Sequence, residues 1–264
     1  MTERNKGGEP QTGEVPLFNG EFLIKADGIH TFAHYYQHPI TNREVVIIGL
    51  NHGGDPEFYG QVLKILEGRT VLYEDLGPDE PQEEAEEQEL DPDNFLIKIQ
   101  VFFDKAGKHL NLKGDKSYFD HSAPNWYCAE ELLSSSPDED KRGEIMESLM
   151  DKVSSLTVDE TDPISNKLDE LIQNIDENKF TRRDFAQGFI YIWSNPKIMA
   201  IFSEILGAPR DEGVFETFDR IIEEKDPGKI GIPFGAAHIT NLRKLCEGRG
   251  YKHISSEDLV NLKF

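Results

Sequence analysis

The chain has 264 residues, of which 37% are hydrophobic and 30% are charged, and its formal net charge is −22. This composition is typical of a globular protein and excludes a fibrous or fully disordered chain. The negative charge repels phosphate backbones, and no basic run is longer than two residues, so the sequence disfavours nucleic-acid binding. No apolar run approaches the roughly 18 residues of a membrane-spanning helix, which predicts no membrane span.

The N-terminal residues are polar and lack the apolar segment of a signal peptide. We expect residues 1–20 to form a disordered leader and residues 21–264 to form a single domain. The two cysteines, Cys128 and Cys246, stand far apart, without the spacing of a redox or zinc motif. This usage is typical of free thiols in a reducing compartment and predicts a cytoplasmic protein.

Strand patterns dominate the first part of the chain. Residues 22–39 are rich in aromatic side chains and predict one or two strands, and residues 45–49 (VVIIG) predict a buried strand. Residues 54–69 carry apolar side chains at helical spacing, and residues 70–77 predict the next strand. We expect this strand–helix–strand unit to pack as a right-handed parallel crossover.

The middle of the chain changes character. Residues 78–94 form an acidic run with several prolines, which predicts a solvated loop. Residues 95–103 fit either short strands or a helix. Apolar residues at helical spacing then recur within residues 134–206, which predicts a helical insertion.

The C-terminal part returns to alternating helices and strands. Residues 214–224 predict an amphipathic helix, followed by a strand at 230–234, a helix at 240–247 and a short strand near residues 253–254. The sequence therefore predicts an α/β fold, with a central, mostly parallel sheet built from the N- and C-terminal regions. We expect the three apolar strands to lie parallel in that sheet.

Two segments share one plan, in which an apolar strand ends in a G-x-x-H motif and a helix follows. Gly49 precedes His52 in the first segment, and Gly235 precedes His238 in the second. Glycine has no Cβ, so the backbone can turn sharply and a ligand can approach it closely. Open parallel sheets bind ligands outside the carboxyl ends of their strands. Glu74 ends the strand after His52, and we expect all three side chains to reach one crevice.

Two imidazoles and a carboxylate can bind a divalent metal with open positions for water, and such a site suits hydrolysis. Ligands of one metal lie about 2.0–2.2 Å from it and hence roughly 3–4 Å from one another. The same groups can also act as general acid and base without a metal. The residues alone leave both interpretations open.

The segments VVIIGLNHGGDPEFYGQVLKILEGRTVLYEDLG and IGIPFGAAHITNLRKLCEGRGYK resemble the TraB/Tiki/GumN family, part of a wider superfamily with ChaN and the erythromycin esterases. The family is marked by two G-x-x-H motifs, a glutamate and an arginine. The motifs map onto His52 and His238, and the glutamate maps onto Glu74. The resemblance covers most of residues 32–264 in order and is strongest around the two histidines.

The arginine of the family best matches Arg210, with Arg220 as the alternative. The family usually shows Arg-Asn at this point, whereas here Asp211 follows Arg210. By resemblance, Arg210 stabilises the developing oxyanion.

The resemblance implies a metal-dependent hydrolase of a peptide or amide-like bond, in which His52, His238 and Glu74 hold Mn, Co or Zn. A first alternative is a metal-independent ester hydrolase similar to the erythromycin esterases. A second is a non-catalytic module that binds haem or another ligand, as ChaN does. The substrate is a small molecule or a peptide whose identity the sequence does not reveal.

One further group of histidines stands outside these motifs. His30, His34 and His38 recur at every fourth position, which places them on one face of a helix or a strand. A metal cluster is one interpretation. Their aromatic neighbours favour a half-exposed strand instead.

Overall fold

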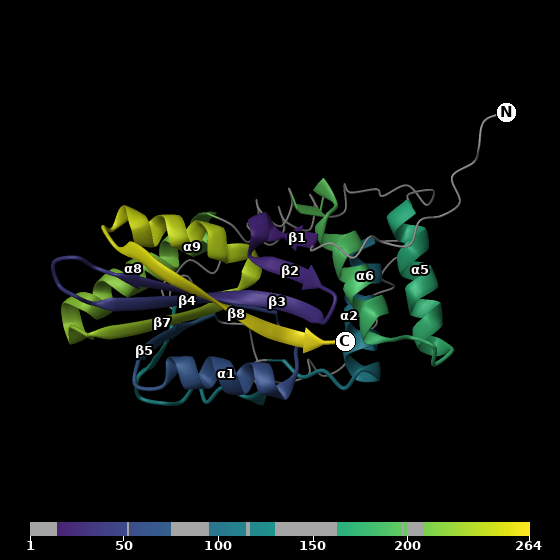
Figure 1. The fold of residues 1–264 in the computed structure, drawn as a ribbon, viewed down its shortest axis with the longest axis horizontal. Coiled ribbons are helices and arrows are strands. Elements are labelled where there is room, and N and C mark those ends of the chain that lie inside the picture. The colour runs from purple at the N-terminus through teal and green to yellow at the C-terminus, as the bar shows by residue number, and fades with distance from the viewer. Residues whose placement is uncertain are drawn as a thin grey trace, which may run out of the picture.

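The computed structural model describes residues 15–51, 53–74, 95–114, 117–129, 163–196, 198–199 and 208–264. A mixed β-sheet forms its centre, and helices cover both faces (Figure 1). The strands are β1 (Val15–Leu17), β2 (Phe22–Lys25), β3 (Gly28–Gln37), β4 (Glu44–Leu50), β5 (Thr70–Tyr73), β6 (Trp126–Cys128), β7 (Lys229–Gly235) and β8 (Lys252–Lys263). The helices are the short 3-10 helix η1 (Phe18–Gly20), α1 (Pro56–Leu66), α2 (Phe95–His109), α5 (Pro163–Asp176), α6 (Arg182–Trp193), α8 (Ala208–Lys225) and α9 (Ala236–Gly248).

Four strands of the sheet run parallel, in the order β4, β7, β5, β6. The three apolar strands of the sequence are β4, β5 and β7, so their predicted parallel arrangement is confirmed, as is the α/β class. The sheet as a whole is mixed, because β1, β2, β3 and β8 pair antiparallel. Leu50 of β4 pairs with Gly235 of β7, so the carboxyl ends of these two strands lie level.

The helices pack on the sheet according to the alternation of its side chains. Val45 and Ile47 of β4 belong to a core shared with α8 and α9. Val46 and Ile48 point the other way, into a core shared with α1. Alternate residues of a strand face opposite sides, so one continuous apolar run supplies both cores. Figure 1 shows α9 and α1 on opposite sides of the sheet.

Helices α2, α5 and α6 form a separate group at one end of the sheet (Figure 1). Residues 95–103, which fit strand or helix in the sequence, belong to α2. The ion pairs Lys98–Asp169 and Lys105–Asp176 join α2 to α5. Helices α5 and α6 lie within the predicted insertion, whereas residues 130–162 and 200–207 lie outside the described residues, as does the acidic run at 78–94.

The N-terminal boundary of the domain differs from the prediction. Residues 15–20 fall within the leader predicted at 1–20, yet Val15–Leu17 pair with β2 and Phe18 is buried. The predicted boundary is therefore wrong, because these short apolar residues complete the sheet edge and the core beside α6. Residues 1–14 lie outside the described residues.

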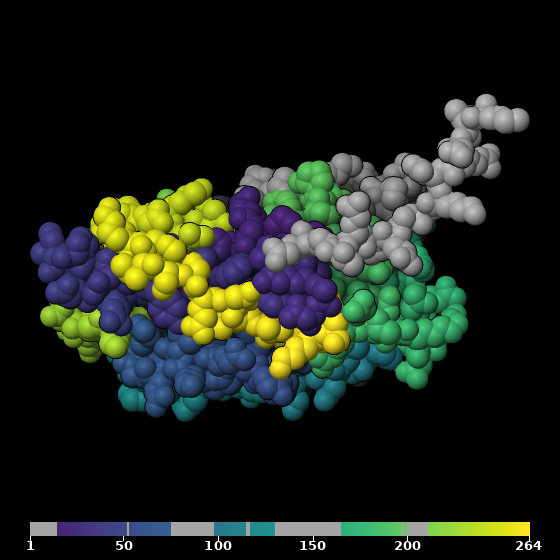
Figure 2. Space-filling model, viewed as in Figure 1, coloured from purple at the N-terminus to yellow at the C-terminus, as the bar shows by residue number. Residues whose placement is uncertain are grey.

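The C-terminal strand is longer than the predicted segment near residues 253–254. β8 pairs with β3 along the full length of β3. Its first half is exposed and polar, so the apolar pattern that marks a buried strand is missing there. In Figure 2 the C-terminal segment lies between the N-terminal strands and the region of α1. Among the described helices, none is both long and apolar enough to cross a membrane.

Candidate functional site

His238 is buried in the first turn of α9, directly behind the carboxyl end of β7. Its Nδ1 lies 2.6 Å from Oδ1 of Asp211, in the first turn of α8. Because a carboxylate can only accept here, Nδ1 carries the proton and donates. The second Asp211 oxygen accepts from Asn241 Nδ2 at 3.0 Å. Asp211 thus fixes the orientation of the imidazole and leaves Nε2 directed away from α8.

Glu74 follows β5 directly and faces the other nitrogen of His238. Its Oε1 lies 3.7 Å from His238 Nε2, and its Oε2 accepts a hydrogen bond from the Gly235 N–H at 2.8 Å. Glu74, Asp211 and His238 are each at most 8% exposed. The structure therefore brings together two of the three predicted site side chains, although they stand more than 160 positions apart.

Two predicted site residues remain untested. His52 lies outside the described residues. Arg210 belongs to the first turn of α8, next to Asp211, but its side chain is not described. The alternative, Arg220, comes nine residues after Asp211 and hence about 13 Å further along the helix, which makes it the less suitable candidate.

The structure tests in part whether the predicted ligands could hold a metal. Within the described residues, no group of three His, Cys, Asp or Glu side chains is arranged to hold a metal ion. The separation of 3.7 Å between His238 and Glu74 suits two ligands of one ion. Metal-binding histidines also usually donate their other ring N–H to a carboxylate, as His238 does to Asp211. The pair therefore fits a metal, with a third ligand to be supplied from elsewhere.

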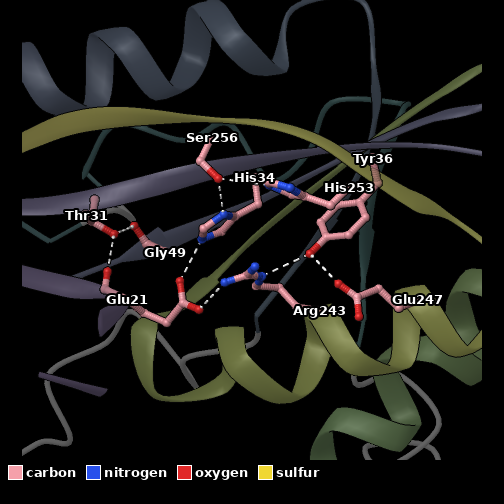
Figure 3. Close-up of polar contacts among 9 residues, drawn as sticks. All are labelled: Glu21, Thr31, His34, Tyr36, Gly49, Arg243, Glu247, His253 and Ser256. Carbon is pink, nitrogen blue, oxygen red and sulfur yellow. Dashed lines mark hydrogen bonds and ion pairs between the residues drawn. The ribbon is translucent and has the colours of Figure 1, made fainter. Parts of the chain in front are cut away.

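The two motif glycines have different roles. Gly235 is both the last residue of β7 and the N-cap of α9, and its N–H holds Glu74. Gly49 lies inside β4, where a Cβ would come within 2.5 Å of Thr31 Oγ1. Figure 3 shows the Thr31 hydroxyl hydrogen-bonded to the Gly49 carbonyl. Gly49 therefore allows close packing against β3 and makes no turn, contrary to the role predicted for it.

Asp211 is the site residue that sequence reasoning did not assign. The sequence contained one signal: Asp211 stands where the resembled family has asparagine, beside the candidate arginine. Its partner His238 lies 27 positions away on another helix, a contact that no local spacing reveals.

A cavity of about 420 Å³ opens beside Glu74 and His238. Leu50, Asn51 and Gly235 line it at the carboxyl ends of β4 and β7. Opposite them stands a wall of aromatic side chains from η1, β2, α2 and α6, which consists of Phe18, Phe22, Phe103, Phe185, Phe189 and Trp193. The cavity lies at the sheet edge where the sequence predicts the crevice, and the helical group supplies its far side.

Two histidines of the second group, His30 and His34, make polar contacts within the fold. His30 and His34 are buried in β3, so the predicted half exposure is wrong for both. His34 Nε2 lies 2.6 Å from Glu21 Oε2, and its Nδ1 lies 2.8 Å from Ser256 Oγ. Ser256 of the neighbouring strand β8 and Glu21, which Arg243 of α9 binds, enclose the His34 ring.

Figure 3 shows Glu21 between His34 and Arg243. Arg243 Nη1 donates to Glu21 Oε1 at 2.7 Å, and Arg243 Nε donates to the Tyr36 hydroxyl at 2.9 Å. Burial raises the pKa of Glu21, but the hydrogen bonds and charges of His34 and Arg243 lower it by a larger amount. The pKa of Glu21 therefore lies below its ordinary value. Burial also raises the pKa of Tyr36 to about 12. The cluster attaches α9, which carries Arg243, to β3.

The metal-cluster interpretation of the second group receives no support from this arrangement. His30 bonds Asp258 and Asp27, and His34 bonds Glu21 and Ser256. The nitrogens of both rings are thus engaged by protein groups.

Comparison with known proteins adds no family assignment. No family model, curated protein or solved structure matches the chain. The candidate site therefore rests on its own geometry and on the motif resemblance.

Proposed function

We propose that the protein is a hydrolase of an ester or amide-like bond, with Glu74 and His238 as the reacting pair. The observation that carries this proposal is the chain of contacts from Asp211 through His238 to Glu74, at the wall of a largely apolar cavity. A base, an acid and a shielded space for the substrate are the elements that hydrolysis requires.

The contacts suggest a role for each residue. Asp211 holds the imidazole and favours the form with a proton on Nδ1, so Nε2 is left to accept one. Glu74 is fixed by the Gly235 N–H through one oxygen, and its other oxygen faces His238. A water molecule positioned between Nε2 and Oε1 would lose its proton to this pair as it attacks a carbonyl carbon. Arg210, beside Asp211 in the chain, is the proposed stabiliser of the resulting oxyanion.

In the leading version, His238 and Glu74 hold a divalent metal together with His52 as the proposed third ligand. A bound metal of this kind supplies a water of lowered pKa and polarises the carbonyl. Asp211 would then serve as the outer carboxylate that orients the ligand histidine.

The second version is a metal-independent ester hydrolase, and the Asp211–His238 contact favours it as well. A buried carboxylate that orients a histidine base recurs in hydrolases that use no metal. In this version the pair of His238 and Glu74 transfers protons directly.

The purified protein should be assayed with aryl esters, alkyl esters and short peptides, before and after treatment with a chelator. The leading version predicts that activity disappears on chelation, returns with Mn²⁺, Co²⁺ or Zn²⁺, and is lost in His52→Ala. Activity that is indifferent to chelation supports the second version. A folded preparation without turnover of any of these substrates, with or without added metal, would contradict the proposed function.

A further inference from the structure

We infer that the substrate of this site carries an elongated apolar group, and that this group occupies the 420 Å³ cavity while the scissile bond lies at Glu74 and His238. The inference deepens the proposed function and rests on it for the reaction, although binding of the apolar group can be tested alone.

The size of the cavity sets the size of the group. Ligand sites for small molecules commonly measure about 300–1,000 Å³. An apolar cavity of about 150 Å³ is enough to hold a benzene molecule. The present cavity is nearly three times larger, so it accommodates a ring with a substituent or a medium-length acyl chain.

The wall is already assembled from aromatic rings that contact one another. The Phe22–Phe189 rings stack with centroids 5.7 Å apart, and those of Phe103 and Phe189 meet at 6.2 Å. Trp193 closes the wall against Phe18 at 5.1 Å. These rings come from β2, α2, α6 and η1, so ligand binding requires little rearrangement of the wall. Preformed apolar cavities of this kind bind apolar groups.

The charges along the described part of the cavity suit a group that is itself uncharged. Among the described residues that line it, the charged or titratable side chains are Glu74, Asp104 and His238, and none is Lys or Arg. Apart from the reacting pair, Asp104 is the charged side chain among these residues, and the net charge of −22 also disfavours an anionic group here.

Gly107 in α2 lines the cavity and offers a position from which its volume can be reduced. Glycine inside a helix is about 0.8–1 kcal/mol less favourable than alanine. Gly107 has no positive φ that would require glycine, and a Cβ at this position would have no described atom within 4 Å. Because Gly107 lines the cavity, the absence of a side chain at this position leaves space open in the cavity.

Gly60 in α1 offers a matched control. It also lies inside a helix, and a Cβ there would likewise meet no described atom within 4 Å. It is exposed on the surface of α1, and it does not line this cavity. A large side chain at position 60 changes the helix but not the cavity.

The test is calorimetric titration of the full chain with straight-chain methyl ketones from butanone to undecanone, which resemble esters but cannot be hydrolysed. Each added methylene should tighten Kd about fourfold until the cavity is full. Affinity that does not depend on chain length would overturn the inference.

Two variants test whether the ketones bind in the cavity. Gly107→Leu should weaken the longest ketone by about tenfold or more and leave butanone almost unchanged, whereas Gly60→Leu should bind the whole series as the wild type does. In a Trp126→Phe background, Trp193 is the remaining tryptophan, and its fluorescence should change on binding of undecanone. A folded Gly107→Leu protein with wild-type affinity would contradict the inference. If that variant does not fold, the chain-length series and the Trp193 signal still decide.

The outcomes separate this inference from the proposed function. Chain-length-dependent binding without ester or amide turnover would leave the cavity assignment in place and remove the hydrolase. Turnover without any preference for apolar groups would leave the hydrolase in place and remove the cavity assignment.

Discussion

Two buried histidines, each placed between polar partners, differ in their surroundings. His34 lies between Glu21 and Ser256, and Arg243 binds the second oxygen of Glu21. His238 lies between two carboxylates, Asp211 and Glu74, and lines a cavity. The first histidine is enclosed by strands on both sides, while the second stands at the carboxyl end of a parallel strand.

Under the proposed function, the difference implies that burial beside a carboxylate is not sufficient to mark a reactive histidine. In the His34 cluster a cation balances the carboxylate, and Ser256 of β8 engages the other ring nitrogen, so these contacts stabilise the fold. In the His238 cluster Nε2 and Oε1 remain at 3.7 Å from each other, and a substrate can reach them from the cavity. Both clusters use α9, which carries His238 in its first turn and Arg243 five residues later. The closed cluster therefore holds in place the helix that positions the open one.

The largest expected effect is on the open cluster. Glu74→Gln keeps a carbonyl oxygen that can accept from the Gly235 N–H, but it removes the base. We expect the rate of hydrolysis to fall by about 10²–10⁴-fold, with the thermal unfolding midpoint almost unchanged. Glu57→Gln, at an exposed position of α1, is the control and should retain full activity. Wild-type turnover in the Glu74 variant would exclude Glu74 from the reaction.

The next largest effect is on the closed cluster. Arg243→Met leaves Glu21 buried without its guanidinium partner and also removes a donor to Tyr36. Loss of one partner from a buried ion pair typically costs about 3 kcal/mol of unfolding free energy. Denaturant unfolding measures this value. Lys244→Met alters the neighbouring position of α9 and should change the free energy by less than about 0.5 kcal/mol. Equal stability of the two variants would show that the cluster does not hold α9.

A smaller effect is expected at the residue that links His238 to α8. Asp211→Asn introduces the asparagine that the resembled family has at this point and retains an oxygen that can accept from Nδ1. We expect turnover to decrease about 10–100-fold, because groups that orient a reacting histidine contribute in this range. Asp219→Asn, on the same helix but bonded to Arg249, should leave turnover unchanged. An Asp211 variant as active as the control would reduce this contact to a structural one.

The smallest effect is a dependence of stability on pH. The pKa of Glu21 lies below its ordinary value of 4.5 in the folded protein. Its contribution is therefore fully present above about pH 5 and is lost as the pH falls through the folded pKa. Glu21→Gln should flatten the decrease of the unfolding midpoint between about pH 5 and pH 3, relative to Glu57→Gln. Parallel curves for the two variants would contradict the depressed pKa.

Much of the fold followed from local patterns. The apolar runs of β4 and β7 and the helical spacing of α1 report burial directly, so their positions and the α/β class could be predicted. β8 was predicted too short because exposed polar residues form its first half, and pairing with β3 determines its length. Val15–Leu17 were assigned to the leader because three residues carry no readable period, although they complete the sheet edge.

The site was predictable where strand ends determine it. Glu74 and Gly235 follow neighbouring parallel strands, and this topology alone brings them together. Asp211 was not assigned, because its contact with His238 depends on the packing of α8 on α9. The aromatic wall was likewise unreadable, since its rings come from four separate elements whose side chains look like ordinary core residues in the sequence.

The central claim is that His238 reacts whereas His34 stabilises, and one crossed measurement tests it. His238→Asn and His34→Asn should each be assayed for turnover per folded molecule and for unfolding free energy. We expect His238→Asn to lose about 100-fold or more in turnover. We expect His34→Asn to retain near wild-type turnover while it loses about 1–3 kcal/mol, because Glu21 loses a buried partner. Equal turnover in the two variants, or loss of turnover in His34→Asn alone, would contradict the assignment of the reactive site to His238.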